Sequence, residues 1–259
     1  MGVRPRLWAV LIVLLAFAGT PSGFAQGGEI TVAAASDLNF VFKEIVTGFE
    51  RQTGHRVKLS LGSSGNFFAQ LSHGAPFDLF FSADLMYPKK LAEAGLADPA
   101  TLFMYGVGRL VLWVPNGSPI DVGALGMAAL QHPSVQKIAI ANPKHAPYGR
   151  AAVAAMEHFK VYDAVKDRLV LGENISQTAQ FVQVGGAEIG ILAWSLAVAP
   201  VMKETGLFWD VPLDAYPRLE QGAVMMNQAS DPKTARAFLD YVKSAEVRRV
   251  FARYGFVLP

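Results

Sequence analysis

Short apolar runs alternate along this chain with longer segments in which apolar residues recur every three or four positions. The run 29–35 is followed by such a segment from Leu38 to Phe49, and the runs 55–61 and 76–84 are each followed by another. Buried strands that alternate with amphipathic helices form parallel sheets covered by helices on both faces. The pattern therefore predicts an α/β fold whose ligands bind at the carboxyl ends of the strands.

The same pattern restarts in the second half of the chain. Apolar runs at 137–141 and 168–172 each lead into a helical pattern, and further strands are predicted at 110–114, 188–194 and 222–226. The two halves thus repeat one order of strand, turn and helix.

Four of these strands lead into their helices through turns rich in small and polar residues. The turns contain Ser36, the stretch Gly62-Ser63-Ser64-Gly65, the loop 142–149 and residues 173–176. A helix amino terminus presents unpaired N–H groups at the positive end of the helix dipole, where an anion binds well. A single turn of this kind is commonly a helix cap, with Ser64 as the capping residue here. Two turns from each half predict an anion clamped between two lobes.

The expected donors are backbone N–H groups together with the hydroxyls of Ser36, Ser64 and Tyr148. Neutral donors suit a fully deprotonated oxyanion, because each of its oxygens accepts hydrogen bonds and none has a proton to donate. A protonated phosphate would need a carboxylate partner, and Asp37 is the acid beside the first turn. Two roles stay open for Asp37: it complements the helix dipole, or it contacts the ligand.

The stretch 1–25 has the organisation of a secretory signal peptide. Two arginines precede an apolar run at 7–18, and the small residues Gly23 and Ala25 fit a cleavage site before Gln26. The run is shorter than a membrane-spanning helix, which leaves a signal anchor as the weaker alternative, and no later apolar run is long enough to span. We therefore expect an exported protein, which in a bacterium is periplasmic.

Composition narrows the possible functions further. The chain has 23 lysine and arginine residues against 21 acidic ones, and the signal peptide takes two arginines and no acid with it, which leaves a neutral mature chain. Neutrality argues against a nucleic-acid partner, because such a partner calls for a basic face. The sequence contains no cysteine, which excludes a disulfide framework, a thiolate metal site and a thiol nucleophile. We expect no cofactor.

The residue types that hydrolases use are present without the spacing of their motifs. Gly62-Ser63-Ser64-Gly65 is not a Gly-x-Ser-x-Gly motif, and the five histidines show no spacing that pairs one with a serine and an acid or builds a metal site. His145, beside Lys144 in the third turn, is the best functional candidate among them, and a solvated surface loop is the alternative. We therefore expect a binding protein and not an enzyme.

Six motifs spread over the chain form a recognisable set. They are Ala34-Ala35-Ser36, Gly62-Ser63-Ser64-Gly65, Ala75-Pro76-Phe77-Asp78-Leu79-Phe80-Phe81-Ser82-Ala83-Asp84, Asn142-Pro143-Lys144-His145-Ala146-Pro147-Tyr148-Gly149, Glu188-Ile189-Gly190-Ile191-Leu192 and Arg253-Tyr254-Gly255-Phe256. In this order, over the whole mature chain, the set resembles the periplasmic molybdate-binding proteins of molybdate ABC transporters.

The resemblance implies a two-lobed periplasmic-binding-protein fold of type II. Each lobe would be a mixed, mainly parallel sheet flanked by helices, with the ligand in the cleft between the lobes. The first lobe would comprise 26–107 and 222–259, and the second lobe 108–221. The hinges would fall near 105–109 and 220–222.

The resemblance also implies ligand contacts. The positions that match the family's contacts are Ser36, Ser64, Tyr148 and Ile175, the last through its backbone N–H, and Asp37 is a possible addition. One branch of the family has alanine in the third turn and a ligand tyrosine at the end of a later strand, where this chain has Ala193 and Trp194. Tyr148 is therefore expected to supply that hydroxyl here.

The ligand implied by the resemblance is molybdate or tungstate, bound as the oxyanion without a protein ligand on the metal. A monomer would deliver it to an inner-membrane ABC permease. One alternative is a protein of the same fold for sulfate, phosphonate or chelated iron, which an arginine or an extra carboxylate inside the cleft would favour. The other is a secreted hydrolase that uses Ser64 or Ser36, which a histidine within hydrogen-bond reach of either hydroxyl would support.

Overall fold

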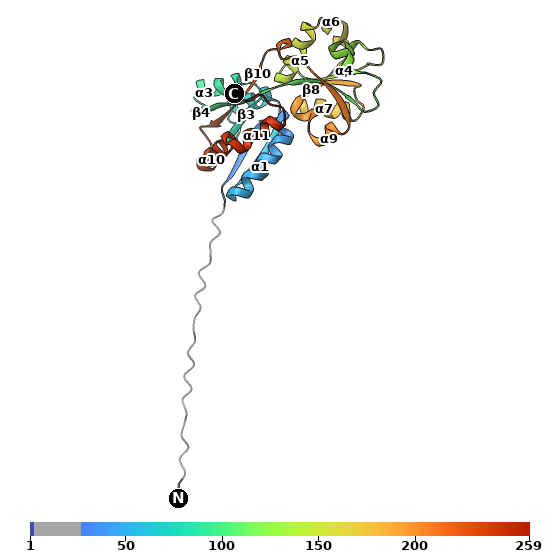
Figure 1. Cartoon of the computed structure of the whole chain (residues 1–259). Helices are drawn as coiled ribbons and strands as arrows, with labels where there is room; N and C mark the ends of the chain where they lie inside the picture. The colour runs from blue at the N-terminus through green and yellow to red at the C-terminus, as the bar shows by residue number, and fades with distance from the viewer. Residues whose placement is uncertain (3–26) are drawn as a thin grey trace.

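The computed structural model describes residues 1–2 and 27–259, which fold into two lobes that each contain a five-stranded sheet (Figure 1). The predicted signal peptide, 1–25, lies almost entirely outside the described residues. Within the described part of the chain, no helix has both the length and the apolar character needed to cross a membrane. The chain passes into the second lobe after residue 108 and returns before residue 219.

The first lobe has its strands in the order β2-β1-β3-β10-β4. Their bounds are β1 Glu29–Ala35, β2 Arg56–Gly62, β3 Leu79–Ser82, β4 Ala97–Gly108 and β10 Leu219–Met226. β1 runs parallel to β2 and β3, whereas β10 runs antiparallel to β3 and β4. The helices are α1 Asn39–Thr53, α2 Ser64–Ser72, α3 Met86–Glu93, α10 Pro232–Lys243 and α11 Ala245–Arg253.

Both faces of this sheet are covered because successive side chains of a strand point to opposite faces. Ile30 and Val32 of β1 pack with apolar residues of α1, α10 and α11. Ala33, which follows Val32, packs on the other side with Phe67 and Leu71 of α2. A strand that helices cover on both faces buries the side chains of both faces. This is why a continuous apolar run was predicted for β1.

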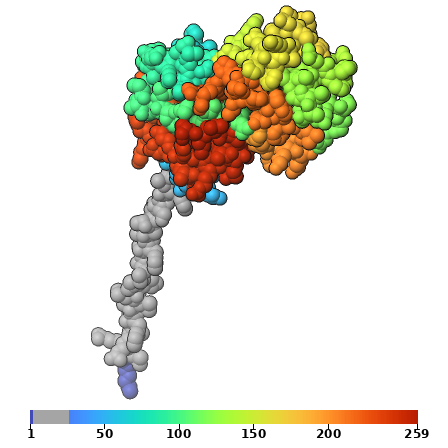
Figure 2. All heavy atoms as spheres, turned by 45° about the horizontal axis from the view of Figure 1, so that its top comes forward, coloured from blue at the N-terminus to red at the C-terminus, as the bar shows by residue number. Residues whose placement is uncertain are grey.

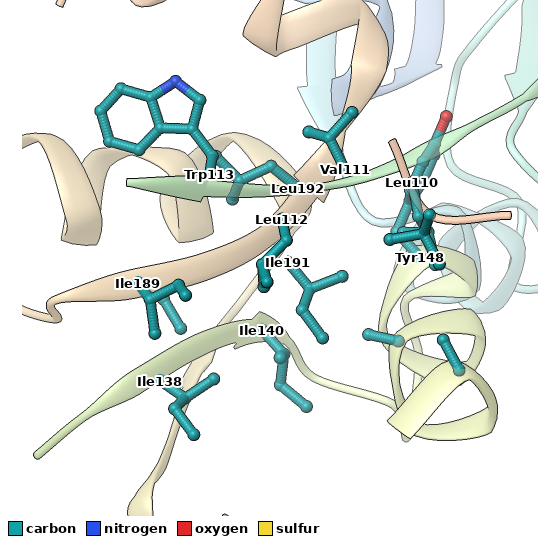
Figure 3. Close-up of a cluster of buried hydrophobic side chains, with 14 of the residues drawn as sticks. Leu110, Val111, Leu112, Trp113, Ile138, Ile140, Tyr148, Ile189, Ile191 and Leu192 are labelled. Carbon is teal, nitrogen blue, oxygen red and sulfur yellow. The ribbon is translucent and has the colours of Figure 1, made fainter. Parts of the chain in front are cut away.

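The second lobe has the strand order β7-β6-β8-β5-β9. Its strands are β5 Leu110–Pro115, β6 Ile138–Ala141, β7 Leu169–Gly172, β8 Ile189–Ala193 and β9 Gly206–Asp210. Its helices are α4 Val122–Leu125, α5 Pro147–His158, α6 Tyr162–Val165, α7 Ile175–Gln183, α8 Trp194–Ala197 and α9 Pro200–Lys203. β6 is parallel to β7 and β8, and β5 is antiparallel to β8 and β9. The apolar core fills the space between these strands and α5 (Figure 3).

The structure contains two strands that the apolar pattern does not predict. β4 begins with Ala97-Asp98-Pro99, a polar stretch typical of a turn, and it pairs with β10 through two register shifts. β9 is a short edge strand with a single paired neighbour, β5, so it lacks the fully apolar run of a central strand. Both sheets are mixed, as the resemblance implied.

The two crossings between lobes lie at Arg109 and in the segment 211–218. β10 pairs with β4 from its first residue, where Leu219 lies opposite Gly108. Residues 219–221, which the sequence-based boundary assigns to the second lobe, therefore belong to the sheet of the first lobe. In Figure 2 the lobes lie against each other, with the carboxyl-terminal helices on the first lobe.

Gly149 lets the amino terminus of α5 lie against the end of β6. A Cβ atom at this position would lie 2.1 Å from the carbonyl oxygen of Ala141 and 2.8 Å from the nitrogen of Pro143, both backbone atoms. Gly123 of α4 is exposed, and a Cβ there would approach only a side-chain oxygen of Asp121, at 3.3 Å. Gly149 and Gly123 therefore differ in the space that each leaves for an added Cβ, so Gly123 can serve as the control for Gly149.

We expect Gly149→Ala to destabilise the protein by about 2 kcal/mol, because the added methyl group overpacks a backbone contact that cannot give way. Gly123→Ala should be neutral or stabilising by up to ~1 kcal/mol, because alanine is the better helix former. Urea denaturation of both variants measures the difference. Equal stability of the two variants would show that β6 and α5 are not packed as described.

Candidate anion-binding site

A narrow cavity of about 10 Å³, roughly the space of one water molecule, lies between the lobes, at the carboxyl ends of their parallel strands. Its lining residues are Ala35, Ser36, Asp37, Gly62, Ser63, Ser64, Ala83, Ala146, Pro147, Tyr148 and Ile175. Sites for drug-sized molecules usually enclose roughly 300–1,000 Å³. The cavity is therefore far too small for a drug-sized ligand, and none of the residues that line it is lysine, arginine or histidine.

Four turns bring helix starts to this cavity. β1 leads into the short 3-10 helix η1, Ser36–Leu38, and then α1; β2 leads into α2, β6 into α5 and β7 into α7. The first N–H groups of a helix have no partner within it, and their aligned dipoles favour negative charge. Three helices of nine or more residues, α2, α5 and α7, begin at cavity-lining residues.

Ser36 and Ser64 are held with their hydroxyl protons available. The Oγ of Ser64 accepts a hydrogen bond of 2.9 Å from the N–H of Ala83, and the Oγ of Ser36 accepts one of 3.3 Å from the N–H of Ser176. A hydroxyl that accepts from a backbone N–H still has its proton to donate. Both serines are almost completely buried, so these protons point into a region shielded from water.

The residue that caps α2 is Ser63 and not Ser64, which corrects the role expected for Ser64. The Oγ of Ser63 accepts from the N–H of Asn66, whereas Ser64 is the first residue of the helix. Because Ser64 does not cap the helix, its hydroxyl is available to the cavity.

Tyr148 and Asp37 meet across the interface between the lobes. The Oη of Tyr148 lies 3.0 Å from Oδ2 of Asp37 and donates to it. The ring of Tyr148 sits at the end of the second lobe's apolar core beside Leu110, with its hydroxyl directed away from that core (Figure 3). The hydroxyl that the sequence assigned to the ligand is thus engaged by a carboxylate of the first lobe.

Gln221 of β10 and Tyr105 of β4 complete this buried network. The Nε2 of Gln221 donates to Oδ2 of Asp37 at 2.8 Å and lies 3.1 Å from the Oη of Tyr148. The hydroxyl of Tyr105 lies 2.8 Å from the Oε1 of Gln221, which fixes the orientation of the amide. Gly108 leaves room for the network, because a Cβ there would lie 2.3 Å from the Oη of Tyr148.

Burial raises the pKa of Asp37 to about 6, although hydrogen bonds from Gln221 and Tyr148 act in the opposite direction. Burial also raises the pKa of Tyr105 and of Tyr148 well above the usual value, and the charge of Asp37 adds to both shifts, so both tyrosines are neutral donors. Oδ1 of Asp37 is buried and has no hydrogen-bond partner among the described residues. The carboxyl group can therefore change its charge near neutral pH.

A second set of contacts joins the lobes at the rim of the cleft. The Nδ1 of His145 lies 2.9 Å from the Oγ of Ser63, its carbonyl accepts from the N–H of Gly65, and Glu173 contacts the side-chain amide of Asn66. Glu173 lies 3.6 Å from the Nε2 of His145, which is beyond hydrogen-bond distance. His145 is thus half-buried between the lobes and is not a free surface residue.

This geometry gives no support to a hydrolase at Ser36 or Ser64, since the histidine contacts Ser63, whose Oγ already caps α2. No cluster of His, Cys, Asp and Glu that could hold a metal ion occurs among residues 1–2 and 27–259.

All five residues proposed from the sequence line the cavity or its network: Ser36, Asp37, Ser64, Tyr148 and Ile175. Trp194, which stands near the family's later tyrosine, is not among the lining residues; its ring stacks on the guanidinium of Arg109 at 3.9 Å. Sequence reasoning missed four residues that hold the site in place: Tyr105, Ser176, Ser195 and Gln221. Of these four, Gln221 alone had a signal in the sequence, because it is a polar residue in the mostly apolar strand β10.

Comparisons with known proteins agree with this geometry. The family model described as bacterial extracellular solute-binding protein matches residues 30–257. The molybdate-binding protein ModA of Rhodobacter capsulatus is 39% identical over 90% of both chains. The chain belongs to the ModA family of bacterial extracellular solute-binding proteins. The ModA of Azotobacter vinelandii is 38% identical over 96% of this chain and 97% of its own.

The fold expected for the ModA family is confirmed by a solved structure. The periplasmic molybdate-binding protein of Azotobacter vinelandii superposes with a TM-score of 0.82 at 31% identity, over 89% of this chain and 99% of that one. The two mixed sheets flanked by helices are therefore a periplasmic-binding-protein fold.

The raised pKa of Asp37 predicts how stability depends on pH. The carboxyl group is ionised more easily in the unfolded chain, with a pKa near 3.8, than in the folded one, with a pKa of about 6. Its ionisation therefore reduces the free energy of unfolding as pH rises from about 4 to 6, and the reduction is complete above about pH 7. We expect Asp37→Asn to be more stable than the parent by about 3 kcal/mol at neutral pH and equally stable near pH 4.

Asp78→Asn is the matched control, because this buried carboxylate behaves in the opposite way. Burial favours a higher pKa for Asp78, but hydrogen bonds from Thr31 and Ser230 outweigh burial and lower it. Denaturation of both variants and the parent between about pH 2 and 8 should show Asp37→Asn gaining stability over the parent as the pH rises from about 4 to 7. Asp78→Asn should fall below the parent in stability as the pH rises toward about 4 and stay below it at higher pH. A loss of stability in Asp37→Asn at neutral pH would contradict the destabilising role of this carboxylate.

Proposed function

We propose that the mature protein is a periplasmic solute-binding protein that captures molybdate or tungstate as the tetrahedral oxyanion. It passes the anion to an ABC permease in the inner membrane. It acts as a monomer, uses no cofactor and catalyses no reaction. The observation that carries the proposal is a small interlobe cavity lined by helix amino termini and serine hydroxyls, without a cationic side chain.

The proposed contacts are of two kinds. Ser36 and Ser64 donate their hydroxyl protons, because backbone N–H groups already occupy one acceptor position of each oxygen. Tyr148 and Ile175 donate their backbone N–H groups from the first turns of α5 and α7. These donors suit an anion without protons, since none of them needs a proton from the ligand.

The choice of molybdate rests on the relatives and on size. The relatives that share 38% and 39% identity over most of their length are named for molybdate. Molybdate and tungstate are larger than sulfate, so donors fixed on helices and spaced for them leave sulfate with longer and weaker hydrogen bonds.

A carboxylate inside the cleft favours a second candidate. Asp37 lines the cavity, and an ionised carboxylate there accepts a hydrogen bond from a protonated anion such as hydrogen phosphate or a phosphonate. No arginine lines the cavity, so this candidate depends on Asp37 alone.

Titration calorimetry with molybdate, tungstate, sulfate and phosphate tests the proposal. Each hydrogen bond to a charged group contributes roughly 1.5–3 kcal/mol, and a smaller anion stretches the bonds to several of the proposed donors at once. We therefore expect molybdate and tungstate to bind at least about 100-fold more tightly than the other two anions. Tighter binding of sulfate or phosphate would reject molybdate as the ligand.

Ser64→Ala tests the proposed site. Loss of one hydroxyl donor to a buried anion should weaken molybdate binding by roughly 1.5–3 kcal/mol, or about 10- to 150-fold. Ser72→Ala is the control, because Ser72 ends the same helix and its exposed hydroxyl bonds only the carbonyl of Phe68. If Ser64→Ala binds molybdate as tightly as Ser72→Ala, Ser64 does not contact the anion.

A further inference from the structure

Asp37 is the unusual group in the cavity, because the other polar groups that line it are neutral. Its Oδ2 receives both hydrogen bonds that the protein directs at the carboxyl group, from Tyr148 and from Gln221. Its Oδ1 is buried and has no partner among the described residues, on a side chain that lines the cavity. The two oxygens of one carboxyl group thus have different environments.

The arrangement of Oδ2 is fixed by groups outside the cavity. Tyr105 holds the amide of Gln221 so that its NH₂ faces Asp37, and Ser195 donates to the carbonyl of Asp37 at 2.7 Å. The carboxyl group therefore cannot turn away from these donors without breaking its hydrogen bonds to Tyr148 of α5 and Gln221 of β10. A hydrogen bond at Oδ1 has to come from the contents of the cavity.

Among residues 1–2 and 27–259, no charged group compensates an ionised Asp37. The titratable groups that face it are the hydroxyls of Tyr148 and Tyr105, both neutral. α7 and α8, which pack against η1, contain no titratable side chain. The charged residues of α1 and β2, which also pack there, are exposed or lie at the far end of α1: Lys43, Glu44, Glu50, Arg51, Arg56 and Lys58.

The basic residues next to Tyr148 in the chain are occupied at the rim. Arg150 pairs with Asp84, and His145 contacts Ser63. An oxyanion in the cavity would therefore meet an ionised Asp37 with no cation between them, in a site shielded from water, where repulsion between like charges is strong.

We infer that Asp37 binds the oxyanion as a neutral acid, with its proton on Oδ1 donated to an oxygen of the ligand, and that this proton makes the site specific for a fully deprotonated anion. The inference rests on the proposed function, a cavity for a tetrahedral oxyanion. Oδ2 keeps its bonds to Tyr148 and Gln221. The proton comes from solvent, so each anion that binds to ionised protein takes up one proton.

The protonation of Oδ1 decides between two classes of ligand, fully deprotonated anions and anions that carry a proton. A neutral acid donates a hydrogen bond and needs an acceptor, which every oxygen of molybdate provides. An ionised carboxylate can only accept, so it selects an anion that carries a proton, such as hydrogen phosphate. Asp37 in its neutral form therefore favours molybdate and disfavours phosphate.

Calorimetry of molybdate binding, repeated in buffers of different ionisation enthalpy, counts the protons taken up. With a pKa of about 6 in the free protein, Asp37 is ionised at about pH 7.5, and we expect uptake of about one proton per anion. At about pH 5 the uptake should fall to about one tenth of a proton. The affinity should decrease about tenfold per pH unit above pH 7 and change little below pH 5.

Asp37→Asn and His145→Gln separate the possible sources of the proton. Asparagine can accept from Tyr148 and Gln221 with its oxygen and donate to the ligand with its amide, so Asp37→Asn should bind molybdate without proton uptake and without the pH slope. His145 lies at the rim of the cleft beside Glu173, and His145→Gln should retain the full uptake.

Four results would overturn the inference. Tight molybdate binding by the parent protein without proton uptake at about pH 7.5, or loss of the uptake in His145→Gln, leaves the proposed function standing and removes Asp37 as the proton carrier. Phosphate binding that exceeds molybdate binding and disappears in Asp37→Asn would make Asp37 an ionised acceptor. Failure of the parent protein to bind molybdate at all would reject the proposed function, and the inference with it.

Discussion

The direction of four parallel strands determines which backbone groups face the cleft. β1 and β2 in the first lobe, and β6 and β7 in the second, end at the interface between the lobes. A helix that follows a strand begins where the strand ends, so its amino terminus and its unpaired N–H groups face the other lobe. The apolar strands and the amphipathic helices are needed for folding in any case, and the donors of the cavity come from the same elements. The fold thus provides an anion site without a buried cation.

In a site built from neutral donors, each acceptor oxygen must also keep a proton free to donate to the anion. Ser36 and Ser64 satisfy this demand because each oxygen accepts from a backbone N–H and its proton stays free. Asp37 is the exception, since an ionised carboxyl group has only acceptors. Gln221 and Tyr148 compensate part of its charge but leave its pKa raised to about 6 by burial. In the proposed site, the charge of this one carboxyl group distinguishes anions that carry a proton from those that do not.

The sequence predicted those site residues that lie in contiguous turns. Ser36, Ser64, Tyr148 and Ile175 each lie in the turn that links a strand to the next helix, so the apolar pattern that locates the strand also locates the turn. Gln221 and Tyr105 come from strands whose partners are more than 100 residues away, and no local pattern records such a contact. β4 was missed because Asp98-Pro99 resembles a turn, although two register shifts accommodate it in the sheet. The capping residue of α2 was misplaced by one position, from Ser63 to Ser64, which is within the uncertainty of any helix boundary.

The contacts between the lobes differ in how much they can stabilise closure. Those at the rim, such as the pair of Arg150 and Asp84, are partly exposed, and ion pairs of this kind contribute little. Those inside the cavity are buried, and closure there leaves two serine protons and Oδ1 of Asp37 facing a space in which water has little room. Unsatisfied polar groups in such a space are costly, whereas an anion accepts from both serines and, when Asp37 is protonated, from its Oδ1. Because an anion gains these hydrogen bonds only when both lobes contact it, it binds the closed arrangement more tightly and shifts the population toward it. The polar interior, more than the rim, is what makes closure depend on the anion.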